Sequence, residues 1–290
     1  MEVTLQMGVS GALMGLVYAL IAYGFQLTFA TSKSINFGQG ELVMVSAFIS
    51  LTMQHFGLPY WAMVPAGLFC GVLLGLVVER LAVRLALEQK SEGWILMTII
   101  LGLFAFSAAE NIWGRDDQPF PTPISSEPLH FFGISVTPVE LSVAIGVLSV
   151  MGLIELFKRQ TLWGKAFEAV SADRDAAELM GISAKRTIML SYGLSGLVAA
   201  MAGILVSPIT TVGPTMASAL ILKAFAVAVV AGLDSGFGVV LVGLFLGALE
   251  SLASYYIGSG WREAPGLILL ILALAVKPTG IFGKTSIRKV

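Results

Sequence analysis

Nine apolar segments, separated by short polar stretches, make up most of this chain. At a rise of about 1.5 Å per residue, several are long enough to cross a hydrocarbon core of about 30 Å as α-helices. Three cover only about half to two-thirds of that thickness, so they are half-helices, tilted helices or helices extended by polar flanks. The pattern predicts an all-α polytopic membrane protein with about eight to nine transmembrane or half-membrane helices, in segments 7–30, 42–53, 61–83, 94–113, 141–157, 188–206, 220–231, 239–257 and 267–276.

Two of the short segments, 42–53 and 220–231, follow polar, glycine-bearing stretches that we expect to be non-helical, residues 34–41 and 210–215. Interrupted segments in corresponding positions of two halves indicate an inverted repeat and a transport path between the halves. Irregular backbone inside lipid must be buried in protein or line a cavity. The candidate pathway residues are therefore Asn36, Phe37, Gly38, Gln39, Gly40, Glu41, Gly213, Thr215 and Lys223.

Composition excludes a water-soluble fold. With 57% hydrophobic and 12% charged residues over 290 positions, the chain has more apolar surface than a soluble protein can hide, whereas lipid can cover it. The N-terminus lacks the basic region of a secretory signal, so we expect the first apolar segment to remain as a helix of a single transmembrane domain, residues 1–290. His55 and His130 are single and far apart, which argues against a metal site.

The distribution of Lys and Arg predicts the orientation. If the N-terminus is outside and the C-terminus is cytoplasmic, only Arg115 and Arg262 of the 17 basic residues lie outside, and Lys223 lies within the membrane. Positive charges concentrate on the cytoplasmic side of membrane proteins. Residues 114–138 then form the external loop, and residues 158–186 a cytoplasmic loop. The basic residues expected inside are Lys33, Arg80, Arg84, Lys90, Lys158, Arg159, Lys165, Arg174, Lys185, Arg186, Lys277, Lys284, Arg288 and Lys289.

The loop 158–186 is charged and amphipathic, yet it joins two helices suited to lipid. Asp173 is placed to cap a short helix at its N-terminus, and Gly181 is placed where the chain can turn out of that helix. An amphipathic element exposed to water predicts a docking site for a soluble partner. Its residues are Asp173, Arg174, Asp175, Ala176, Ala177, Glu178, Leu179, Met180, Gly181 and Ile182.

Lys223 stands alone in an apolar segment, where an unpaired charge costs about 2.5–3.5 kcal/mol on insertion scales. Two interpretations stay open: a residue of the pathway, or a structural ion pair with Glu250 in the next segment. Glycines at four-residue spacing predict close helix packing rather than nucleotide loops. These glycines are Gly67, Gly71, Gly75, Gly243 and Gly247.

Four motifs, in the expected order, resemble those of the LivH-type permeases of the branched-chain amino acid (hydrophobic amino acid, amide and urea) ABC transporter family. Residues 36–41 (NFGQGE) are similar to the family's N-F-A-H-G-E signature, 222–225 (LKAF) to its K-A-F element, and 277–283 (KPTGIFG) to its closing R-P-x-G-L-F-G. Residues 175–181 are similar to the EAA-x-x-x-G loop that seats on the ATPase, with Asp175 in place of Glu.

The resemblance has three departures: Gly38 for Ala, Gln39 for His and Lys277 for Arg. In the family the loop that contains Gln39 follows the solute path. Because this chain lacks the imidazole there, the resemblance does not predict which solute it carries. Members of this family carry amino acids, urea, short amides or aromatic acids.

The resemblance implies a permease subunit of an ABC importer in a bacterial inner membrane, which takes a small solute from a periplasmic binding protein. It implies as partners two ATP-binding cassette subunits, a second permease chain that is related rather than identical, and membrane lipid; no nucleic acid is expected. ATP and magnesium would be bound by the ATPase and no cofactor by this chain. Residues 280–285 (GIFGKT) end like a phosphate loop, but Pro278 stands where its first Gly is required, so the chain has no ATP site.

No motif of an enzyme is present, neither a G-x-S-x-G elbow nor a spaced His/Cys cluster. Two other functions stay open on the residues alone. An ion-coupled secondary transporter shares broken helices and inverted repeats, and needs titratable acids such as Glu41 and Glu250. A passive urea or amide channel fits the neutral polar stretches, but leaves the loop 158–186 without a role.

Overall fold

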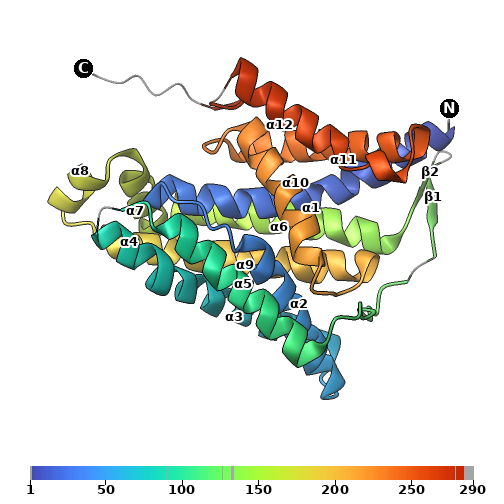
Figure 1. Ribbon diagram of the computed structural model, residues 1–290, viewed down its shortest axis with the longest axis horizontal. Helices are drawn as coiled ribbons and strands as arrows, with labels where there is room; N and C mark the ends of the chain where they lie inside the picture. The colour runs from blue at the N-terminus through green and yellow to red at the C-terminus, as the bar shows by residue number, and fades with distance from the viewer. Residues whose placement is uncertain (1, 90, 126, 132–133, 278, 284–290) are drawn as a thin grey trace.

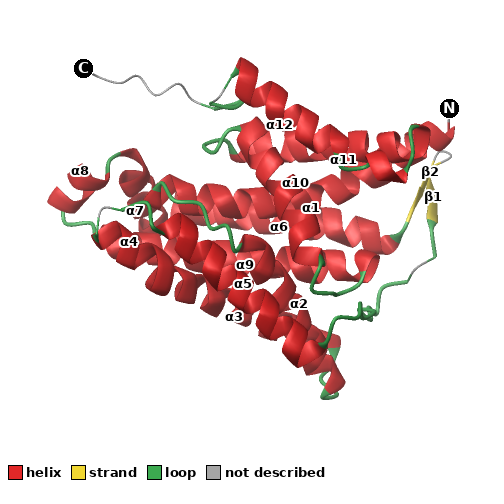
Figure 2. Cartoon of the chain, viewed as in Figure 1, coloured by secondary structure: helices red, strands yellow, loops and turns green. Residues whose placement is uncertain are grey.

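The computed structural model describes residues 2–89, 91–125, 127–131, 134–277 and 279–283. Figures 1 and 2 show a bundle of helices with one small β-hairpin. The helices are α1 (Glu2–Ser32), α2 (Gln39–His55), α3 (Tyr60–Val78), α4 (Arg84–Glu88), α5 (Trp94–Trp113), α6 (Pro138–Gln160), α7 (Leu162–Ala172), α8 (Arg174–Leu179), α9 (Ala184–Thr210), α10 (Met216–Ala231), α11 (Gly236–Tyr256) and α12 (Ala264–Val276). A π-turn, Glu79–Val83, joins α3 to α4, and a 3₁₀ turn, Ser259–Trp261, precedes α12.

The prediction of an all-α polytopic membrane protein is confirmed. Every predicted apolar segment coincides with helix, apart from residue 257, which follows the end of α11, and the segment 61–83 runs from α3 through the π-turn. Seven helices of the described chain are long and apolar enough to cross a membrane. Of the three short segments, the one at 267–276 extends through the turn before it into a span of 18 residues, Ser259–Val276. The other two become α2, with 17 residues, and α10, with 16. Their relation by an inverted repeat stays a prediction.

Several helices begin at a residue whose side chain caps the helix N-terminus. A side-chain oxygen at the N-cap accepts a hydrogen bond from a backbone N–H that has no partner within the helix. Five helices, α6, α7, α8, α9 and α11, begin in this way. Their capping residues are Thr137, Thr161, Asp173, Ser183 and Ser235.

The stretch predicted as non-helical over 34–41 ends earlier, because α2 begins at Gln39. Asn36 explains the difference: its side chain accepts a hydrogen bond from Gly38 N at 3.0 Å, and its backbone carbonyl accepts one from Gln39 N at 3.2 Å. Such an Asx turn starts the helix three residues before the apolar run does. Residues 39–41 therefore form the first turn of α2.

The predicted external loop 114–138 contains a hairpin that the sequence pattern did not indicate. Strands β1 (Leu129–Phe131) and β2 (Ile134–Val136) pair antiparallel, with His130 opposite Ser135. Gln6 holds the hairpin against the start of α1, since its side chain donates to Ser135 O at 2.5 Å and accepts from Ser135 N at 2.6 Å. The same loop pairs Gln118 with Val212, in the stretch before α10.

The hairpin and the start of α1 lie at one end of the bundle, and α7 and α8 lie at the opposite end (Figure 1). The loop 158–186 is more structured than predicted, because α7 precedes the short helix α8. Of the residues used for the orientation and the closing motif, Lys90, Pro278, Lys284, Arg288 and Lys289 lie outside the described residues.

The predicted glycine seams are confirmed. Gly243 and Gly247 of α11 lie directly against Gly15 and Gly11 of α1, so that the two helix backbones touch. On the other side of the bundle, a Cβ added at Gly71 of α3 would lie 2.5 Å from the carbonyl oxygen of a residue of α9. Small residues allow this close approach of helices in lipid. The two seams fix α1 and α9 at the centre of the bundle.

Candidate functional site: clefts along α1

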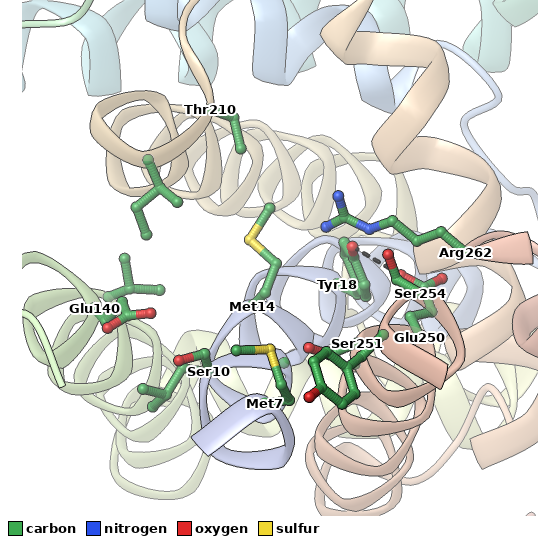
Figure 3. Close-up of a pocket in the computed structure, with 16 residues that line it drawn as sticks. Met7, Ser10, Met14, Tyr18, Glu140, Thr210, Glu250, Ser251, Ser254 and Arg262 are labelled. Atoms are coloured by element: carbon green, nitrogen blue, oxygen red, sulfur yellow. Dashed lines mark hydrogen bonds between the residues drawn. The ribbon is translucent and has the colours of Figure 1, made fainter. Parts of the chain in front are cut away.

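A cleft opens beside the first half of α1 (Figure 3). This half of α1 lies at the end of the bundle that holds the hairpin (Figure 1). The cleft consists of two adjoining cavities of about 510 and 260 Å³, with walls from α1, α6, α9, α10, α11 and the segment before α12. We call it the hairpin-side cleft. The two cavities share the wall residues Met14, Tyr18, Thr210 and Arg262.

Lys223 and Glu250 form an ion pair in the wall of this cleft, with Lys223 Nζ 3.0 Å from Glu250 Oε2. The Tyr18 hydroxyl donates to the same oxygen at 3.1 Å, and Lys223 Nζ lies 5.4 Å from the centre of the Tyr18 ring. The Glu250 side chain is 2% exposed and that of Lys223 11%. The interpretation of Lys223 as the partner of Glu250 is therefore confirmed, and the same residue also lines the cleft.

We expect Lys223→Met to lower the melting temperature of the purified chain in detergent, because it leaves Glu250 buried without its cation. Removing one member of a buried ion pair costs about 3–5 kcal/mol, whereas replacing both members by apolar residues is often tolerated. The double variant Lys223→Met with Glu250→Leu should therefore recover much of the loss. A double variant as unstable as the sum of the single changes would contradict the pairing as the reason for the burial.

Three of the predicted pathway residues, Gly213, Thr215 and Lys223, line the smaller cavity of this cleft. Gly213 lies directly against the Asp117 carboxylate of the external loop, so a side chain at this position would have to displace that carboxylate. Thr215, which precedes α10, is exposed. Sequence analysis did not find Tyr18 and Asp117 as wall residues, and it noted Arg262 only as one of two basic residues outside.

Asn36 and Gln39 lie elsewhere, in a buried polar network between α1, α2 and α9. Their side chains are 1% and 0% exposed. Asn36 Nδ2 donates to Gln39 Oε1 at 3.2 Å, and Gln39 Nε2 donates to Ser195 O at 3.2 Å. Ser195 Oγ in turn lies 2.9 Å from Gly24 O and donates to it. Both amides are therefore part of the packed interior, and neither lines the hairpin-side cleft.

The remaining residues of this stretch place α2 against its neighbours. The Phe37 ring stacks on Trp94 with a centroid distance of 6.4 Å. Gly38 approaches α5, and a Cβ at Gly40 would lie 2.7 Å from a carbonyl oxygen of α10, so the two short helices pack directly together. Glu41 has a buried oxygen, Oε2, with no hydrogen-bond partner in the part of the chain that the structure describes.

A second cleft lies along the other half of α1, between α1 and α7. It also consists of two adjoining cavities, of about 500 and 470 Å³, which share Tyr23, Glu155, Asp234 and Gly236. We call it the α7-side cleft. Tyr18 lines one cleft and Tyr23 the other, and the residues between them, 19–22, are fully buried. The rise from Tyr18 to Tyr23, five steps along the helix, is about 7.5 Å, so a short buried section of α1 separates the two clefts.

The predicted docking segment, residues 173–182, forms α8 and the turn after it. Asp173 Oδ1 accepts from Ala176 N at 3.0 Å, Arg174 pairs with Glu178 at 3.5 Å, and Gly181 has a φ of +84°. The Leu179 and Met180 side chains are 88% and 82% exposed. Two large apolar side chains are thus exposed at the end of the bundle opposite the hairpin (Figure 1). Ala177 is buried, and Ile182 is half-buried beside it.

Within the described residues, no group of three or more His, Cys, Asp or Glu side chains is placed to hold a metal ion. The polar groups that line the clefts are therefore amides, hydroxyls, carboxylates, two lysines and arginines. Such groups bind and orient a small polar solute by hydrogen bonds and charge.

Residues 7–276 match the family model described as "Branched-chain amino acid transport system / permease component". The chain belongs to this permease family. It is thus a permease component of an ABC transport system, not an enzyme, and a multi-pass protein of the inner membrane. Membership decides against the secondary transporter and the passive channel. Membership of the family also implies that the chain functions in a complex with ATPase and binding-protein components.

Relatives cover nearly the whole permease. The chain is 29% identical to the high-affinity branched-chain amino acid transport system permease protein LivH of Salmonella typhimurium, over 99% of this chain and 97% of LivH. It is 27% identical to BraD of Pseudomonas aeruginosa, over 99% and 98%. A fructose import permease, FrcC of Rhizobium meliloti, is 28% identical over 84% of this chain and 70% of its own length.

Among solved structures, the chain is similar to PsaBC from Streptococcus pneumoniae in complex with Fab. The TM-score is 0.50 at 14% identity, over 93% of this chain and 91% of the other. At this identity the likeness concerns the fold alone.

Proposed function

We propose that this permease imports a small solute, a branched-chain or other amino acid, an amide, urea or an aromatic acid, delivered by an extracytoplasmic binding protein and powered by a separate ATPase subunit. The observation that carries the proposal is the family match over residues 7–276, which includes both clefts and the docking segment. The full-length similarity to LivH and BraD favours an amino acid within this group.

The proposed route follows α1 from the hairpin-side cleft to the α7-side cleft. Gly213, Thr215 and Lys223 lie at its entrance. Residues 36–41 act where the route is closed, because Gln39 is hydrogen-bonded to Ser195 of α9, and Ser195 in turn donates to Gly24 O of α1. Opening of the route is proposed to break this network, so that both amides face the solute.

Residues 173–182 are proposed as the contact with the ATPase, with the exposed Leu179 and Met180 at its centre. This assignment places α7 and α8 in the cytoplasm and the N-terminal end of α1 outside, in agreement with the distribution of basic residues. The full assembly is proposed to contain two ATPase subunits and a second, related permease chain. Co-purification of a Walker-type ATPase with this chain tests the partner assignment, and a chain that transports solute without one contradicts it.

The route predicts a pattern of chemical access in a Cys70→Ser background. Thr215→Cys should react with a small water-soluble thiol reagent in the resting transporter, because Thr215 is exposed in the cleft. Gln39→Cys should be protected at rest and should react when the partner traps ATP. Ser207→Cys, a position 1% exposed on α9, is the buried control and should stay unreactive in both states. Inertness of both Thr215→Cys and Gln39→Cys in every state would remove the route from this region.

A further inference from the structure

The first turn of α7 exposes two large apolar side chains just beyond a membrane span. Leu162 is 82% exposed and Trp163 is 51% exposed. They follow α6, which is one of the helices long and apolar enough to cross a membrane and which ends at Gln160. Neither side chain lines the α7-side cleft or belongs to the docking segment. Adjacent exposed apolar side chains mark a surface that another body covers.

The rest of α7 is held by the bundle. Its buried side chains Phe167 and Val170 face inward, and the helix contacts α1, α6 and α9. Gly164 lies directly against the backbone of Lys158, so α7 turns tightly onto the end of α6. The second half of α7 lines the α7-side cleft, with Glu168 among the wall residues. The exposed side chains of the first turn are therefore covered neither by the described bundle nor by a cleft.

The length of α6 places this turn at the membrane surface. A helix of 23 residues is about 35 Å long, slightly more than a hydrocarbon core of about 30 Å. Near its end α6 still exposes Leu153 and Leu156, which suit contact with lipid chains. Head groups add about 5–7 Å on each side of the core. Leu162, six residues after Leu156, therefore lies within the head-group layer and continues the lipid-facing surface of α6.

Two basic residues flank the apolar pair. The Arg159 side chain is 73% exposed, and its Nε donates to Glu155 Oε1 at 2.9 Å, which leaves its terminal N–H groups without a partner among the described residues. Lys165 is exposed and forms no ion pair within the described part of the chain. Trp and Leu beside Lys and Arg are typical of helices that lie in the membrane interface. Basic residues at this depth attract anionic lipids.

We propose that the first turn of α7 is an anchor that binds anionic phospholipid at the membrane surface. Leu162 and Trp163 insert at the boundary of the acyl chains, and Arg159 and Lys165 bind the lipid phosphates. In the proposed orientation this surface is the cytoplasmic leaflet. The inference goes beyond the proposed import function. Because α7 contacts α8, which lies farther from the long helices (Figure 1), the anchor holds the docking segment at a fixed height above the lipid.

The test is contact quenching of a bimane fluorophore on Leu162→Cys, in a Cys70→Ser background, with the purified transporter in nanodiscs. All discs contain the same mixture of phosphatidylcholine and phosphatidylglycerol, and only the lipid that carries brominated acyl chains differs. Both brominated lipids should quench, and phosphatidylglycerol should quench more, since each basic residue enriches an anionic lipid about fivefold. The two leaflets are identical, so the result does not depend on the orientation of the chain.

Three variants serve as controls. Ala172→Cys, exposed at the other end of α7, should show little quenching with the same fluorophore. Arg159→Gln with Lys165→Gln should remove the preference for phosphatidylglycerol and keep the quenching by phosphatidylcholine, because the apolar pair remains. Arg174→Gln is the matched charge control, since Arg174 is exposed on α8 and pairs with Glu178 at 3.5 Å. It should keep the preference.

Three results overturn the proposal: no quenching at Leu162→Cys by either lipid, equal quenching by the two lipids, or an unchanged preference in the double variant. Quenching that appears only after the ATPase is removed would assign this surface to a protein contact and would also overturn it. None of these measurements uses solute or ATP. Failure of the import function has a different signature, which is the absence of ATP-dependent uptake of any solute that the binding protein delivers.

Discussion

Replacing Leu179 and Met180 together by Asp is expected to abolish solute-stimulated ATP hydrolysis while the permease stays folded. Both side chains are more than four-fifths exposed, so the changes remove no internal packing. At a protein interface the central apolar residues cost about 2 kcal/mol or more each when truncated, and two of them account for a loss of several hundredfold in affinity. The measurement is ATPase activity of the reconstituted transporter, with solute and binding protein present.

Phe56→Asp is the control for this variant. Phe56 is 77% exposed just after α2, away from the docking segment, and the same kind of substitution there should leave ATP hydrolysis unchanged. Normal hydrolysis by the Leu179 and Met180 double variant would show that α8 is not the ATPase contact.

The second large effect is expected from Gly15→Leu, which should prevent accumulation of folded permease in the membrane. A Cβ at Gly15 would overlap the carbonyl oxygen of Gly243, because α1 and α11 touch there through their backbones. The helices have to separate along the seam, at a cost of more than about 3 kcal/mol, since backbone atoms cannot move aside as a side chain does. The amount of monodisperse protein after detergent extraction measures the effect.

Gly8→Leu, on the same helix, is the matched control. A Cβ at Gly8 meets no atom within 4 Å, so this variant should accumulate like the wild type. Equal yields of the two variants would contradict the close packing of α1 on α11.

The sequence was sufficient for the features that depend on local pattern. Apolar runs predicted the positions of the membrane helices because lipid selects for length and hydropathy alone. The cap at Asp173 and the turn at Gly181 were predictable because each depends on one residue and its immediate neighbours. The glycine seam at Gly243 was visible from spacing, although its partner, α1, was not.

The features that the sequence did not predict depend on contacts between segments that are distant in the chain. Asn36 and Gln39 have the residue types of a polar pathway, but the structure pairs them with each other and with Ser195 of α9 in a closed network. Tyr18 joins the ion pair at Glu250, 232 positions away, and no local pattern marks it. The hairpin after residue 128 is only three residues long per strand, too short for periodicity to reveal.

The most direct test of import by an ATP-driven permease is uptake of radiolabelled L-leucine into proteoliposomes that contain this chain with its permease and ATPase partners. ATP is enclosed inside the vesicles and the binding protein is added outside. We expect accumulation above the external concentration that requires both ATP and the binding protein, and that disappears in the Leu179 and Met180 double variant. Uptake that proceeds without ATP, driven by a Na⁺ or H⁺ gradient or stopping when the two sides are equal, would contradict the account.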